Sequence, residues 1–188
     1  MSDPTLLHSS DRLPLTCSRS GACCHGNSVM LNPWELARLA EAKAMSARAF
    51  RDAYCEFGGI RLRFDGVSGW KGLPACSQYD LENGCSVYGG RPLACRLYPL
   101  GRQKKAGALH YMHQGAEFPC LTGCPEVLDL PHMTVAEYVK GQGAEAFESA
   151  EDEYLGLVQN LADGAFSLLL DTGLAESGDV KPLRLCSK

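Results

Sequence analysis

The chain has 188 residues, enough for one ordinary domain with its own core; 45% of them are hydrophobic and 21% are charged. No apolar run reaches the roughly 18 residues that a membrane span requires, and a net charge of -4 leaves no electrostatic footprint for nucleic acid. The N-terminus has no basic start followed by an apolar stretch, so we expect no secretory signal and a cytoplasmic protein.

Two helices are predicted after a short apolar run at 29–31. Asn32 is a candidate N-cap, Pro33 suits the first helical position, and Glu35 completes a capping box. A second helix is expected to begin at Ser46 and to end at the glycine pair 58–59. Its expected apolar face consists of Ala47, Phe50, Tyr54 and Phe57.

Residues 60–64 alternate between apolar and basic side chains, which predicts a half-buried strand. The following region, 66–125, is rich in Gly, Pro and Cys and is expected to be mostly irregular, except for a strand at 109–112 that pairs with 60–64. A loop region of this length is uncommon in a compact domain unless something orders it. A bound metal would do so, because its binding free energy then contributes to folding.

The C-terminal part is predicted to be helical. Thr134 and Glu137 form a second capping box, a glycine-rich break follows at 141–143, and apolar residues recur at helical spacing from Glu145 onward, although Gly164 weakens the pattern. We therefore expect a single domain over 1–188, mainly α with a small β element (α+β) and rich in loops. It comprises a cysteine-rich metal-binding core at 17–124 and a C-terminal helical cover at 132–173.

Ten cysteines are the most informative feature of the composition. In a reducing compartment cysteines are metal ligands or redox groups more often than disulfides. Cys55, on the flank of a predicted helix, and Cys186, in the tail, are expected to take no part. The other eight lie in predicted loops and are the predicted metal ligands: Cys17, Cys23, Cys24, Cys76, Cys85, Cys95, Cys120 and Cys124.

The spacing of these cysteines favours a polynuclear centre. The chain has no C-x2-C pair of the kind that most mononuclear zinc sites use, and the adjacent pair Cys23-Cys24 is expected to point its sulfurs apart. Iron–sulfur centres accept thiolates from separate loops, so an iron–sulfur cluster and a multi-zinc site both remain open. His25 is a candidate additional ligand. Arg91 and Arg96 bracket Cys95 and are expected to offset thiolate charge or donate hydrogen bonds to sulfur.

Two segments resemble the zinc- or iron-chelating CxxCxxCC cysteine-cluster family (YkgJ-like), which includes part of flagellin lysine N-methylase. They are 17–24, CSRSGACC, and 85–99, CSVYGGRPLACRLYP, and Cys76 matches the cysteine that precedes the second segment. The family motif would place a cysteine where this chain has Ser20. Cys55, a histidine or a water would then replace that ligand, unless it is dispensable.

These observations lead to three functional hypotheses. The first is a metal-binding protein with a polynuclear centre, iron–sulfur in preference to zinc, that transfers electrons or senses redox state and so has a redox partner protein. The second is a polynuclear zinc protein with a structural or metal-storage role. The third is an enzyme, either an iron–sulfur oxidoreductase or a methyl-transfer relative of flagellin lysine N-methylase. No nucleophile–base pair or cofactor fingerprint supports the third hypothesis, so we do not expect an enzyme.

Overall fold

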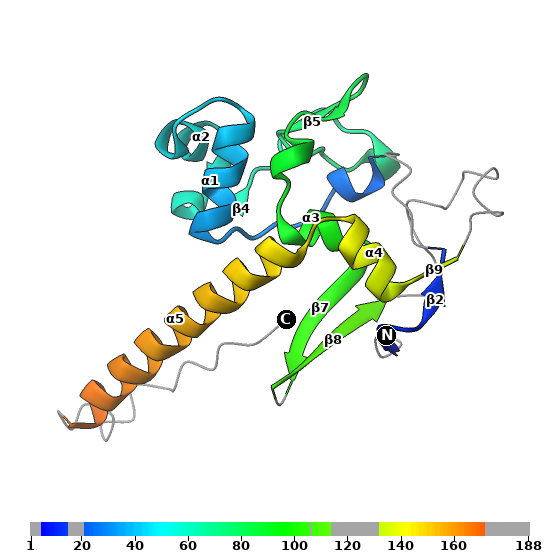
Figure 1. Cartoon of the computed structure of the whole chain (residues 1–188). Coiled ribbons are helices and arrows are strands. Elements are labelled where there is room, and N and C mark those ends of the chain that lie inside the picture. Colours follow the sequence, from blue (N-terminus) through cyan, green and yellow to red (C-terminus); the bar gives the residue numbers. More distant parts are fainter. Residues whose placement is uncertain (1–4, 15–20, 106, 114–131, 172–188) are drawn as a thin grey trace.

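The computed structural model describes residues 5–14, 21–105, 107–113 and 132–171 of the chain (Figure 1). Its helices are α1 (Pro33–Ala42), α2 (Ala47–Tyr54), α3 (Leu93–Leu97), α4 (Val135–Gly141) and α5 (Glu145–Asp171). Short 3-10 turns are η1 (Ala22–Cys24), η2 (Phe57–Gly59), η3 (Trp70–Gly72) and η4 (Tyr88–Gly90). The strands are β1 (Thr5–Leu7), β2 (Arg12–Leu13), β3 (Cys55–Glu56), β4 (Arg61–Leu62), β5 (Tyr79–Asp80), β6 (Gly84–Cys85), β7 (Leu100–Lys105), β8 (Ala108–His113) and β9 (Met133–Thr134).

The predicted starts of α1 and α2 are confirmed. The Asn32 side chain accepts a hydrogen bond from the Glu35 backbone N–H at 2.8 Å, and the Glu35 carboxylate accepts one from the Asn32 N–H at 3.1 Å. The Ser46 hydroxyl accepts from the Ala49 N–H at 3.2 Å. Because the first helical N–H groups have no partner within a helix, these side chains fix where each helix begins.

The expected extent of the second helix is wrong at its C-terminal end. The helix stops at Tyr54, and Phe57 lies in a turn with a left-handed φ of 52° and 66% of its surface exposed. Gly58 and Gly59 also have positive φ, 70° and 105°, which glycine adopts readily. This turn reverses the chain into a β3–β4 hairpin in which Cys55 pairs with Leu62, so Cys55 lies in a strand and not on a helix.

A strand at 109–112 is confirmed as part of β8, but its predicted pairing with 60–64 is wrong. β8 pairs antiparallel with its neighbour β7, in a register that places Tyr111 opposite Arg102, and with β1 on its other edge. The turn between β7 and β8 contains Gly107 at a φ of 80°, so the two strands form a local hairpin. Local pairing closes a much shorter loop than pairing with 60–64 would, and its entropic cost is smaller.

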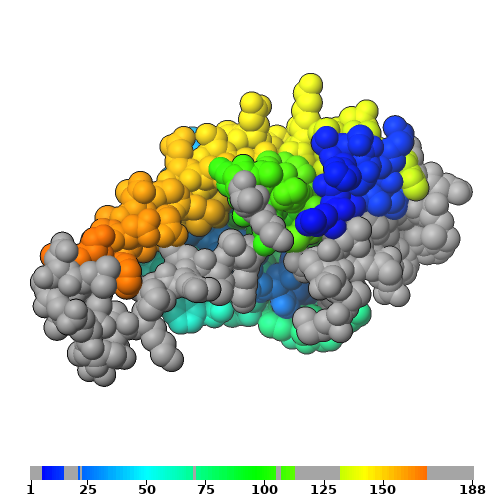
Figure 2. All heavy atoms as spheres, turned by 90° about the horizontal axis from the view of Figure 1, so that it is seen from below, coloured from blue at the N-terminus to red at the C-terminus, as the bar shows by residue number. Residues whose placement is uncertain are grey.

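The C-terminal helices follow the predicted caps. The Thr134 hydroxyl accepts from the Glu137 N–H at 3.1 Å, and the Glu137 carboxylate accepts from the Thr134 N–H at 2.8 Å. Gly164 lies inside α5 without interrupting it. Arg102 of β7 joins the first half of α5 to the sheet through ion pairs with Glu148 at 3.2 Å and Asp152 at 2.9 Å. The second half of α5 extends away from the other described elements (Figures 1 and 2).

The buried side chains form three clusters within the described residues. The largest surrounds α1 and α2 and consists of Val29, Leu31, Leu39, Ala40, Phe50, Cys55, Leu62, Cys76 and Val87. A second contains Leu100, Val135 and Tyr138, and a third contains Leu93, Leu97, Ala144 and Phe147. In this part of the chain, no helix combines the length and the apolar character needed to cross a membrane.

Candidate metal centre

Five of the eight predicted ligands lie within the described residues, and four separate segments supply them. The segments are η1 with Cys23 and Cys24, the loop before β5 with Cys76, β6 with Cys85, and α3 with Cys95. All five thiols are free. Cys17, Cys120 and Cys124, together with Ser20 and Cys186, lie outside the described residues.

The adjacent pair Cys23-Cys24 differs from expectation. The two sulfurs do not point apart but lie 3.9 Å from each other, because the 3-10 turn η1 tightens the backbone that carries them. Two sulfurs bound to one tetrahedral zinc ion at about 2.3 Å each are roughly 3.8 Å apart. The pair can therefore serve one ion or two neighbouring ions, and adjacency alone does not select a polynuclear centre.

The five thiols share one electrostatic environment. The hydrogen bond between Cys24 and Cys23 lowers the pKa of Cys23 to about 7 and raises that of Cys24. Burial raises the pKa of Cys76 to about 11 and also raises the pKa values of Cys85 and Cys95. Negative charge on Cys23 raises the pKa of Cys76, Cys85 and Cys95 further. Ionising all five together would therefore require a cation among them.

Backbone contacts connect the turn that carries Cys23 and Cys24 to the segment that carries Cys76. The Cys76 N–H donates to the Cys24 carbonyl at 2.6 Å, and the Gln78 N–H donates to the Cys76 sulfur at 3.5 Å. The β5–β6 hairpin then places Cys85 opposite Tyr79. Cys24, Cys85 and Cys95 pack against the largest core cluster, of which Cys76 is a member. The thiols are thus integrated into the core of the protein.

The two arginines that bracket Cys95 are both buried, with 7% of Arg91 and 9% of Arg96 exposed. The Arg91 guanidinium lowers the pKa values of the Cys23 and Cys85 thiols. Arg96 donates instead to the backbone carbonyls of residues 89, 91 and 142, at 2.6, 2.9 and 2.8 Å. Among the described residues, no carboxylate lies within ion-pair distance of either guanidinium.

Glu35 reaches further than the sequence indicated. Besides capping α1, its buried carboxylate accepts a hydrogen bond at 2.7 Å from the backbone N–H of Leu93, at the start of the helix that carries Cys95. Burial raises the pKa of Glu35. The capping-box pattern identified Glu35 as a local partner of Asn32, but no pattern in the sequence indicates a contact across 58 residues.

His25 is buried, with 4% of its surface exposed, and its ring Nδ1 lies 2.8 Å from the Gly21 carbonyl. Because a carbonyl only accepts, Nδ1 is the donor in this contact. Nε2 has no partner among the described residues and packs against Gly69, where a Cβ would lie 2.5 Å from it. The ring also contacts Tyr79 edge-on. None of these described contacts is with a cysteine sulfur.

Within the described residues, no three Cys, His, Asp or Glu side chains stand in an arrangement that could hold a metal ion. The donor set nevertheless fits a thiophilic metal in its chemistry, because thiolates are the ligands that zinc and iron–sulfur clusters prefer. The raised pKa values describe protonated thiols packed in a core. Metal binding would release those protons and draw the sulfurs together.

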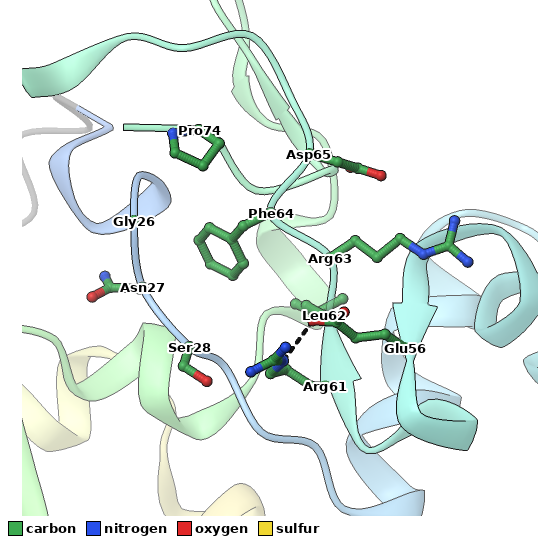
Figure 3. A pocket seen from close by; sticks show the side chains of 10 residues that line it. All are labelled: Gly26, Asn27, Ser28, Glu56, Arg61, Leu62, Arg63, Phe64, Asp65 and Pro74. Carbon is green, nitrogen blue, oxygen red and sulfur yellow. Dashed lines mark hydrogen bonds and ion pairs between the residues drawn. The ribbon is translucent and has the colours of Figure 1, made fainter. Parts of the chain in front are cut away.

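A groove of about 470 Å³ is lined by the segment 26–28, which follows η1, and by the segment 61–65 (Figure 3). Asn27, on its rim, donates from its side chain to the Cys23 carbonyl at 2.8 Å. Phe64 lines the groove, and Arg61 forms an ion pair there with Glu56 at 2.5 Å (Figure 3). No cysteine is among its described lining residues, so the groove is separate from the thiols.

Comparison with protein families gives one match, and comparison with curated proteins and with solved structures gives none. The matching family model is CxxCxxCC, described as a "Putative zinc- or iron-chelating domain", and it covers residues 16–113. This range is just over half of the chain and contains Cys17, Ser20 and the five described cysteines that are predicted ligands. The chain therefore belongs to the CxxCxxCC family.

Proposed function

We propose that the protein holds a polynuclear metal centre on its clustered cysteines, iron–sulfur in preference to zinc, and uses it to transfer electrons or to sense redox state. Zinc or iron chelation is the role that the family description carries. The ligands would be the five described thiols with Cys17, Cys120 and Cys124. An iron–sulfur centre, when bound, supplies one-electron chemistry, and electron transfer would require a redox partner protein.

The observation that carries this proposal is the pairing of five clustered thiols with two buried guanidinium groups. A buried cation normally requires a counter-ion, and neither Arg91 nor Arg96 has a carboxylate partner among the described residues. Each thiolate ligand carries one negative charge, so a centre held by many thiolates has more negative charge than its metal ions neutralise. The two guanidinium groups would offset part of that excess, whereas protonated thiols have no charge to offset.

Metal and acid-labile sulfide content, with an absorption spectrum, would test the proposal on full-length protein purified without oxygen. We expect iron, a matching amount of sulfide and a brown chromophore that reductant bleaches. Two or more zinc ions per chain without sulfide or colour would remove the redox role and leave metal binding. Protein that binds neither metal, purified or reconstituted, would overturn the proposal and return the cysteines to a disulfide interpretation.

The structural zinc role has one observation in its favour. The cysteines pack into or against the largest core cluster, so a metal bound there would stabilise the fold directly. Electron transfer requires no such integration, whereas a structural site does. The sulfide measurement separates the two hypotheses, because polynuclear zinc sites held by cysteine contain no inorganic sulfide.

A further inference from the structure

The Arg91 side chain is clamped on two sides. Its guanidinium stacks on the Tyr88 ring at 3.9 Å from the ring centroid, and its Nη2 donates to the side-chain carbonyl of Gln142. The residue is 7% exposed. Its Nε–H is fully buried and has no acceptor among the described residues. A buried donor left without an acceptor costs about 1–3 kcal/mol, so such groups are rare in folded proteins.

Arg96 and Arg102 provide the comparison: the Nε of Arg102 also lacks a well-aligned hydrogen bond, but it forms an ion pair with Glu148 at 3.2 Å, whereas no such pair is found for Arg91 among the described residues. The Arg96 guanidinium also stacks on an aromatic ring, that of Phe147 at 3.8 Å, but its Nε, Nη1 and Nη2 all donate to backbone carbonyls. Arg96 therefore ties together the segments around α3 and α4. Arg91 is buried to a similar extent, but its Nε–H has no acceptor among the described residues. Its positive charge lowers the pKa values of the Cys23 and Cys85 thiols.

We infer that the Nε–H of Arg91 donates a hydrogen bond to an anionic sulfur atom of the metal centre, either a cysteine thiolate or an inorganic sulfide. This inference rests on the proposed function. Such a bond satisfies the buried donor and brings a positive charge to a centre with excess negative charge. Tyr88 and Gln142 act as positioning residues, since they fix the plane of the guanidinium. Lysine cannot replace Arg91 here, because it has no planar edge to hold in that position.

Anaerobic titration of full-length protein with Co²⁺, which is a coloured probe of thiolate sites, tests this inference. Competition with a chelator gives the affinity, and the sulfur-to-cobalt charge-transfer bands report on the bound sulfurs. We expect Arg91→Gln to bind Co²⁺ 10- to 100-fold more weakly than wild type, the usual effect of losing a hydrogen bond to a metal ligand. Arg91→Lys should recover only part of that loss, and the charge-transfer bands of both variants should shift.

Arg38→Gln is the matched control. Arg38 also stacks on an aromatic ring, that of Trp34 at 5.5 Å, but its side chain is 43% exposed and paired with Glu41, so affinity and spectrum should stay unchanged. Apo-protein near-ultraviolet circular dichroism shows whether each variant folds. If Arg91→Gln does not fold, Arg91→Lys alone decides the outcome.

The outcomes separate this inference from the proposed function. Wild-type affinity and unshifted bands in a folded Arg91 variant would overturn the hydrogen bond while leaving the metal centre intact. A wild-type protein that binds neither Co²⁺ nor iron would remove the proposed function, and this inference with it. If the protein takes up an iron–sulfur cluster, the reduction potential of Arg91→Gln should fall below that of wild type, because hydrogen bonds to sulfur favour the reduced state.

Discussion

Replacing Glu35 by alanine should destabilise the protein far more than the same change at Glu137. Both residues occupy the same position of a capping box, and each accepts from the backbone N–H of its N-cap residue. Only Glu35 is buried, at 2% exposed, and only Glu35 also accepts from Leu93. The two capping boxes therefore separate the local effect of a capping residue from the effect of a buried tertiary contact.

The structure gives the size of the expected effect. Glu35→Ala leaves two buried N–H groups, those of Asn32 and Leu93, without an acceptor, and each such group costs about 1–3 kcal/mol. Partial relaxation and water entry reduce the sum, so we expect a loss of about 2–4 kcal/mol in the free energy of unfolding. Glu137→Ala exposes its freed N–H groups to water, and its loss should be much smaller.

Urea unfolding of the apo protein, followed by circular dichroism with reductant present, measures both losses. Glu35→Gln provides a second comparison, because it retains one acceptor oxygen and lacks the charge. Burial raises the pKa of Glu35 above its usual 4.5, so the protonation-dependent part of its contribution to stability is fully present below that pH and is lost as pH rises through the folded pKa. Equal losses for Glu35→Ala and Glu137→Ala would contradict the role assigned to the Leu93 contact.

Three further predictions follow from the packing and the charges. Gly90→Ala should destabilise by about 1–3 kcal/mol, since a Cβ there would lie 2.5 Å from the Arg38 carbonyl, whereas Gly89→Ala, with open space around it, should be nearly neutral by the same unfolding assay. Arg102→Met should cost about 2 kcal/mol, because Glu148 loses its ion-pair partner and Asp152 keeps only the exposed Lys104. Lys104→Met, at that exposed pair, should change stability by less than about 0.5 kcal/mol. In the apo protein Cys23 should be alkylated faster than Cys24, with a rate that rises through about pH 7, and mass spectrometry showing Cys24 modified first would contradict the assigned hydrogen bond.

Local signals in the sequence were sufficient where the structure depends on local contacts. The capping residues Asn32, Ser46 and Thr134 marked the starts of three helices, because each side chain bonds a backbone group only three residues away. The glycine pair after Phe57 was predicted to end the second helix. In the structure Phe57, Gly58 and Gly59 all have positive φ and Phe57 is exposed, which apolar periodicity could not indicate. Periodicity describes a regular helix and gives no information on where glycine ends it.

Long-range pairing was the part that sequence reasoning missed. The alternation of apolar and polar residues at 60–64 and at 109–112 does not specify which strand pairs with which. The turn at Gly107 brings β7 beside β8, so these two strands pair. The candidate site shows the same limit. Its cysteines were recognised by type and spacing, but the contact of Glu35 with Leu93 and the different surroundings of Arg91 and Arg96 arise only when distant segments meet.

Under the proposed function, the buried arginines provide a stronger argument for a metal centre than the cysteines do. Free cysteine packs well as a small hydrophobic residue, and raised thiol pKa values such as those of Cys76 and Cys95 are what burial alone produces. A core of protonated thiols would have no reason to enclose two guanidinium groups, because an unpaired buried charge is strongly unfavourable. Thiolates that share a metal carry negative charge into the same region and remove that cost. Arg96 already donates to three backbone carbonyls, so Arg91, whose Nε–H has no acceptor among the described residues, is the arginine that the proposed centre would explain.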